Sequence, residues 1–197
     1  SGRLSLIVLA ATIIGLASIP QNANAACIIT TSGSVDCTTN TTTTDSSNLD
    51  GADSISSARR QRFNNGAVIT GAIQSGVTVN GYGLQLGEAG PRSSPITMNN
   101  EGQISVTNNF NSLELNGNGG PVNYFGDGGI TNTNSAAALF ADNVHGNVSI
   151  ATGAGAISGA IGIDASATGA GGLAITTGAG LVSGSTVPGI VATTANG

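Results

Sequence analysis

Ten carboxylates are the side chains of this sequence with the widest capacity for chemistry. Paired carboxylates supply the acid/base catalysis of glycoside hydrolysis, and groups of acidic residues bind calcium. If the segments that carry them stack on one another, Asp142 could approach Asp127 or Asp164. No basic residue follows Arg92, so a cationic partner for a transition state is lacking there. We therefore expect no catalytic residue and no enzyme activity from these acids, which are Asp36, Asp45, Asp50, Asp53, Glu88, Glu101, Glu114, Asp127, Asp142 and Asp164.

Few side chains could hold a metal ion or a cofactor. Cys27, Cys37 and the single histidine, His145, are too few and too scattered for a metal centre, and His145 is predicted in a solvated turn. Three Gly-x-Gly-x-x-x-Gly segments differ by one position from the dinucleotide fingerprint, and no helix follows them. We expect turns there, with glycine supplying positive φ, and no cofactor; the segments begin at Gly81, Gly153 and Gly178.

Composition narrows the possible partners. Charged residues make up 8% of the sequence and the net charge is −5, whereas 39% of residues are hydrophobic, enough to form a core. The one basic cluster, Arg59, Arg60 and Arg62, is too small for the broad basic face that binds nucleic acid. We expect no nucleic-acid partner. Tyr124, Phe125 and Phe140 are expected to stack in the interior, with a surface platform for sugar as the alternative.

The elements that must position these residues are marked by apolar residues, often in apolar-x-apolar pairs, that recur mostly every 8 or 9 positions. Gly, Asn, Thr and Ser fill the intervals, which indicates short strands joined by turns. In each pair, the two apolar side chains point inward and the residue between them points outward. The pairs or their single-residue counterparts begin at Ile96, Ile104, Leu113, Val122, Ile130, Leu139, Val148, Ile157, Ile163, Leu173, Val182 and Ile190.

Three such steps come to about 25 residues, and the sequence repeats at that distance. Residues 150–159 and 175–184 are identical at seven of ten positions. We predict an all-β fold, a right-handed parallel β-helix with about 25 residues per coil. A β-sandwich has similar strand spacing, but the very short strands, the repeat and the scarcity of aromatic residues favour the β-helix.

The first residues have the features of a secretory signal. Arg3 precedes an apolar run over residues 4–17, and a small-x-small site ends at Ala25. We predict a signal-peptide helix over residues 1–25, with cleavage between Ala25 and Ala26. An uncleaved anchor is the alternative, although the run is short for a membrane span.

Export would allow Cys27 and Cys37 to form a disulfide, and lipidation of Cys27 or two free thiols are the alternatives. The Thr-rich run over residues 38–47 is predicted to be an exposed loop or part of a cap. We assign residues 26–64 to an N-terminal cap region and residues 65–197 to the β-helical repeat, which we expect to be truncated at its C-terminus. Residues 87–95 break the period and are predicted to form a protruding loop.

Together, the signal sequence, the early cysteine pair and coils such as residues 157–163 resemble the N-terminal passenger region of a bacterial autotransporter. The resemblance implies an exported, adhesin-like stalk of a Gram-negative bacterium, either at the cell surface and outer membrane or secreted. It also implies a downstream translocating β-barrel, absent from this sequence, and an unidentified surface receptor or glycan as partner. Residues 38–47 and 88–95 are the predicted contact loops. The alternative function is a secreted β-helix that binds or degrades polysaccharide.

Overall fold

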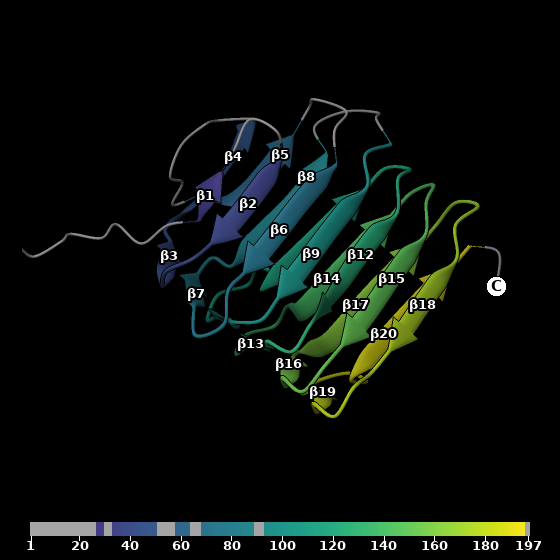
Figure 1. Ribbon diagram of the computed structural model, residues 1–197. Coiled ribbons are helices and arrows are strands. Elements are labelled where there is room, and N and C mark those ends of the chain that lie inside the picture. The colour runs from purple at the N-terminus through teal and green to yellow at the C-terminus, as the bar shows by residue number, and fades with distance from the viewer. Residues whose placement is uncertain (1–26, 30–32, 51–57, 64–67, 89–92, 196–197) are drawn as a thin grey trace, which may run out of the picture.

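The structure is a computed structural model that describes residues 27–29, 33–50, 58–63, 68–88 and 93–195. In this part of the chain, short strands stack into three sheets, which form a β-solenoid of about five turns with about 26 residues per turn. Figure 1 shows the strands side by side from the N-terminal end to the yellow C-terminal end. The predicted signal helix and the cleavage site at Ala25 and Ala26 lie outside the described residues.

Each coil contributes one strand to each of the three sheets over most of the solenoid. The first sheet contains β1 (Ile28–Ile29), β2 (Ser34–Cys37), β6 (Ile69–Ile73), β9 (Ile96–Asn100), β12 (Val122–Gly126), β15 (Val148–Thr152) and β18 (Leu173–Thr176). The second contains β3 (Thr41–Thr43), β7 (Thr78–Gly81), β10 (Gln103–Val106), β13 (Gly129–Asn132), β16 (Ile157–Gly159) and β19 (Val182–Gly184). The third contains β4 (Asp45–Asp50), β5 (Ala58–Phe63), β8 (Leu84–Glu88), β11 (Leu113–Gly117), β14 (Ala137–Asn143), β17 (Ile161–Ala167) and β20 (Ile190–Thr194).

The predicted fold class is confirmed, because each apolar position in the predicted series from Ile96 to Ile190 lies in a strand. Strands of successive coils pair in parallel, and equivalent apolar residues stack on one another. In the first sheet, Val122 pairs with Ile96 and with Val148, each 26 positions away. This stacking places like residues in contact with like, which is why the coil length is visible as a sequence repeat.

The interior of the solenoid consists of these inward-facing columns. Ile96, Val122 and Val148 are each no more than 1% exposed. A fully buried aliphatic side chain of this size contributes about 1.5–3 kcal/mol to folding. Because each coil adds several such residues, the stability of the solenoid rests on contacts between neighbouring coils.

Two buried asparagines close the corners of the coils. The Asn143 side chain is fully buried, and its Nδ2 donates to the carbonyl oxygen of Gly120, 2.7 Å away in the preceding coil. Its Oδ1 accepts a hydrogen bond from the backbone N of Gly146 at 2.9 Å. Asn100 is also fully buried, and its Oδ1 accepts a hydrogen bond from the backbone N of Gly102 at 3.2 Å. These amides satisfy backbone groups that would otherwise be buried without partners.

Glycine serves two different purposes in the turns. Gly81 has a φ of 84°, a conformation that L side chains rarely adopt, as the sequence predicted for this segment. In the segments from Gly153 and from Gly178, no glycine has a positive φ. There, the turns of successive coils approach too closely for a side chain, and a Cβ on Gly180 would collide with the backbone of Gly155. The prediction of positive φ for these two segments was therefore wrong.

Candidate functional site

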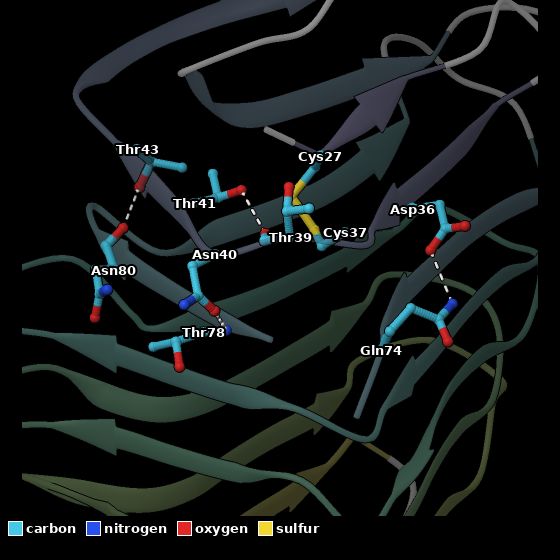
Figure 2. The surroundings of a disulfide bond; sticks show 10 residues. All are labelled: Cys27, Asp36, Cys37, Thr39, Asn40, Thr41, Thr43, Gln74, Thr78 and Asn80. Carbon is cyan, nitrogen blue, oxygen red and sulfur yellow. Dashed lines mark hydrogen bonds between the residues drawn. A yellow bond between two sulfur atoms is a disulfide. The ribbon is translucent and has the colours of Figure 1, made fainter. Parts of the chain in front are cut away.

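The N-terminal end of the solenoid is closed by a short antiparallel strand and a disulfide. Strand β1 pairs antiparallel with β2, and Cys27 is bonded to Cys37 with the two Cα atoms 4.0 Å apart. Figure 2 shows this disulfide beside the side chains that join the first coil to the next. Among them, Gln74 Nε2 donates to Asp36 Oδ1 at 2.9 Å, and the backbone N of Thr78 donates to Asn40 Oδ1 at 2.8 Å.

The threonine-rich run continues this first coil. Strand β3 pairs in parallel with β7, and Thr41 and Thr43 turn inward with 3% and 2% of their surfaces exposed. Thr43 Oγ1 donates to the carbonyl oxygen of Asn80 at 2.9 Å (Figure 2). The same Oγ1 accepts a hydrogen bond from the backbone N of Tyr82. We predicted that residues 38–47 form either an exposed loop or part of a cap. Around β3 the chain is not an exposed loop, because it forms a strand with two inward side chains.

The outer face of the third sheet gathers three of the acidic residues around one aromatic ring. The strand register stacks Glu114 on Phe140 and Phe140 on Asp164 across three successive coils. Asp142 points to the same outer face of β14, two positions after Phe140. All four residues are half-buried. The sequence predicted the approach of Asp142 and Asp164, but it did not predict that Phe140 and Glu114 share their face.

The two ends of this acidic face differ in their environment. Glu114 Oε1 accepts hydrogen bonds from Gln85 Nε2 and Asn116 Nδ2, each at 2.8 Å. Burial raises the pKa of Asp164 above its ordinary value, and the neighbouring negative charge of Asp142 raises it further. The face therefore combines a carboxylate held by amide donors with one whose charged form is destabilised by burial and by a neighbouring negative charge. Such a surface can accept hydrogen bonds from hydroxyl groups while an aromatic ring packs against an apolar face of the ligand.

The other predicted acid pair does not form. Asp127 lies in the turn after β12, at the end of a strand of the first sheet, whereas Asp142 belongs to β14 of the third sheet. Asp127 Oδ1 accepts a hydrogen bond from the backbone N of Ala154 at 3.0 Å and so links two successive turns. Its role in the structure is therefore that of a turn residue.

The aromatic residues separate between the core and the surface. Tyr124 is buried, whereas Phe125 is 43% exposed on the first sheet and Phe140 lies on the third. The expectation that these three rings stack inside the coil was wrong, because adjacent strand residues point to opposite faces. Tyr82 and Phe110 instead form a tilted pair at the corner before β8 and β11, with ring centroids 5.4 Å apart.

The remaining predicted features are the histidine, a metal site, a membrane span and the arginine cluster. His145 lies exposed in the turn after β14. Among the described residues, no group of three or more His, Cys, Asp or Glu is placed to hold a metal ion. The same residues contain no helix that is long and apolar enough to cross a membrane. Arg59, Arg60 and Arg62 lie in β5, whose side chains are outside the description. Residues 89–92 of the predicted contact loop over residues 88–95 also lie outside the described residues.

Comparisons with protein-family models, with curated proteins and with solved structures find no match to this chain.

Proposed function

We propose that this chain is an exported, adhesin-like structural segment that acts as a β-helical stalk. One observation carries the proposal: the parallel pairing in three sheets continues from the first coil to the last without a break in the stacking. A rod built in this way is held by contacts between each coil and its neighbours, so it can separate a surface from the partner that the stalk presents. The resemblance to autotransporter passengers supports this function.

The disulfide at the N-terminal end supports export. Bonds of this kind persist in oxidising compartments and are rare in the cytosol. The preceding apolar run would direct the chain across the inner membrane, and the segment would then be displayed at the cell surface or released. Attachment to the outer membrane would be through a β-barrel outside this chain, and the partner would be a surface receptor or a glycan.

Export can be tested by expressing the chain with residues 1–25 in a Gram-negative host. The expected product begins at Ala26, lies outside the cytosol and has no thiol that reacts with an alkylating reagent before reduction. A matched Leu9→Arg variant, which places a charge in the apolar run, should stay in the cytosol with both thiols reactive. A wild-type chain that keeps residues 1–25 and stays reduced in the cytosol would refute the proposal.

A second candidate function, polysaccharide binding or degradation, is favoured by the acidic face of the third sheet. Phe140 lies between Glu114 and Asp164 in the strand register, which gives a ring for stacking and oxygens for sugar hydroxyl groups. Glycosidases also use paired acidic residues for catalysis. Acidic residues on a solvated surface can equally be present without any catalytic role.

Binding of the wild type and of the Phe140→Ala variant to an array of polysaccharides distinguishes the glycan-binding function from a purely structural stalk. If the face binds glycan, Phe140→Ala loses binding, while Phe125→Ala, which removes an exposed ring on the first sheet, retains it. Release of reducing ends that is abolished by Asp164→Asn would indicate degradation. Equal binding by both phenylalanine variants would exclude the third-sheet face as the glycan site.

A further inference from the structure

One corner between the second and third sheets presents two aromatic rings that neither proposed function uses. The rings of Tyr82 and Phe110 lie at this corner in successive coils, with their centroids 5.4 Å apart and their planes tilted by 56°. Phe110 is 38% exposed, and Tyr82 is partly exposed. Single exposed apolar residues are common on protein surfaces, whereas a tilted pair of rings gathers apolar surface at one place.

The corner that carries Phe110 is longer than the equivalent corners of other coils. Residues 107–112 join β10 to β11, whereas residues 82–83 join β7 to β8 and Ala160 alone joins β16 to β17. Strands β10 and β11 nevertheless pair with both neighbouring coils without a shift in register. The loop over residues 107–112 is therefore an addition to the repeat that the stacking of the coils does not require.

Side-chain amides from two coils hold the backbone on both sides of the Phe110 ring. The backbone N of Phe110 donates to Asn108 Oδ1 at 3.0 Å, and Asn108 Nδ2 donates to the carbonyl oxygen of Gly81 at 2.9 Å. In the next coil Asn132, which is 5% exposed, donates from Nδ2 to the carbonyl oxygen of Phe110 at 2.7 Å. Both backbone polar groups of Phe110 are thus fixed before a partner arrives, which lowers the entropy cost of binding.

The polar groups beside this ring are suited to hydroxyl groups of a neutral ligand. Asn109 is exposed, and its Oδ1 accepts a hydrogen bond from the Oγ of exposed Ser135 at 3.1 Å. No described residue accepts a hydrogen bond from Asn109 Nδ2, so this group can donate to a ligand. Residues 107–112 contain no Asp, Glu, Lys, Arg or His. A phosphate or carboxylate group would therefore find no cationic partner in the loop.

We propose that the Tyr82–Phe110 corner binds a neutral sugar ring of a glycan. A sugar ring has an apolar face of C–H groups and an edge of hydroxyl groups, which matches an aromatic surface flanked by a few polar side chains. The sugar stacks on Phe110, which Tyr82 supports, and its hydroxyl groups bond to Asn109 and Ser135. The inference goes beyond the stalk function, uses none of the residues of the acidic face and does not depend on export.

Affinity electrophoresis of the purified, oxidised chain tests this proposal. Each native gel contains one of four neutral polysaccharides, hydroxyethylcellulose, lichenan, galactomannan or glycogen, and at least one of them should retard the wild type. Phe110→Ala should lower the affinity about tenfold or more, because the ring supplies the stacking surface. Phe125→Ala removes an exposed ring from the first sheet and is the matched control, which should bind as the wild type does. Circular dichroism of each variant checks that the β-structure is retained.

The Phe110→Trp variant keeps the test decisive if loss of the ring disturbs the corner. The chain contains no tryptophan, so the fluorescence of this variant reports the site alone. It should bind as the wild type does, and its emission should shift to shorter wavelength when the retarding polysaccharide is added.

Three results would overturn the proposal. They are no retardation of the wild type by any of the four polysaccharides, equal retardation of the wild type and Phe110→Ala, and an unchanged emission of Phe110→Trp at saturating polysaccharide. Retardation that is lost in Phe140→Ala but kept in Phe110→Ala would also overturn it, and would place the glycan on the acidic face of the third sheet.

Discussion

Tyr124 provides a direct probe of the solenoid interior because only two tyrosines occur in the chain. Its side chain is 1% exposed, and Asn100 Nδ2 lies 3.4 Å from its hydroxyl oxygen. Burial raises the pKa of Tyr124 to about 12, with a smaller lowering by the hydrogen bond from Asn100 and a smaller increase from the charge of Glu101. In a Tyr82→Phe background, Tyr124 is the single phenol, so phenolate absorbance reports its ionisation alone.

The size of the effect on stability follows from the difference between the pKa of Tyr124 in the folded state and its pKa in the unfolded state. An unfolded tyrosine ionises near pH 10, and each unit of pKa difference corresponds to about 1.4 kcal/mol. The unfolded chain therefore loses its proton first, and stability falls as the pH rises from about 10 to about 12. The total loss from this residue is about 3 kcal/mol above that range, and none of it is present below about pH 9.

The raised pKa of Tyr124 is tested by recording phenolate absorbance and circular dichroism in one alkaline titration. The Tyr82→Phe variant should ionise well above pH 10, and its alkaline loss of stability should shrink in Tyr82→Phe/Tyr124→Phe. Glu101→Gln in the same background should lower the pKa of Tyr124. Ionisation near pH 10 with native circular dichroism would refute the inward orientation of Tyr124 and, with it, the register of β12.

Three further predictions concern the cap, the core and the acidic face. Cys37→Ala should lower the free energy of unfolding in urea by about 2–3 kcal/mol, because it opens a short loop that constrains the unfolded chain; an unchanged value would contradict this. Leu139→Ala should cost about 2–5 kcal/mol in the same assay, and Leu173→Ala less than half of that, since Leu173 is already half exposed; equal costs would mean that the last coil is covered. Asp164→Asn should raise the melting temperature at neutral pH but not below about pH 4, because the raised pKa penalises only the charged form; a lower melting temperature at neutral pH would contradict the direction of this shift.

The strands of the central coils were predictable because stacking converts a three-dimensional contact into a sequence period. Ile104, Ile130 and Ile157 lie 26 and 27 positions apart and stack in the second sheet. Each pairs with a residue of its own kind, so the apolar signal recurs wherever a strand begins. The sequence estimate of 25 residues per coil came from the tail, where Val148 and Leu173 pair at that distance.

The second-sheet strand of the first coil was harder to predict because its inward residues are polar. Thr41 occupies the position that Val79 and Ile104 fill in the next two coils, and Thr43 pairs with Gly81, so the threonine run carries no hydrophobic signal. Buried Asn100 and Asn143 were missed for a related reason. Asparagine is usually exposed, and its burial here depends on backbone groups that only the folded turns bring within reach.

Part of the candidate site could be deduced from distance along the chain. Asp142 and Asp164 are 22 positions apart, close to one coil. Asp127 and Asp142 are 15 apart, so Asp127 lies in the turn after β12 of the first sheet and Asp142 in β14 of the third. The stacking of Phe140 between Glu114 and Asp164 needs the exact register, with separations of 26 and then 24. Because coil length varies in this way, the composition of an outer face could not be deduced from the period alone.

Localisation of the mature chain on the cells that produce it tests the central claim most directly. The measurement is antibody labelling of intact, unpermeabilised cells and their culture medium, combined with mass spectrometry of the N-terminus of the labelled protein. The account predicts a chain that begins at Ala26, carries the Cys27–Cys37 disulfide and is found at the cell surface or in the medium. A chain confined to the cytosol, with residues 1–25 intact and both cysteines reduced, would contradict it.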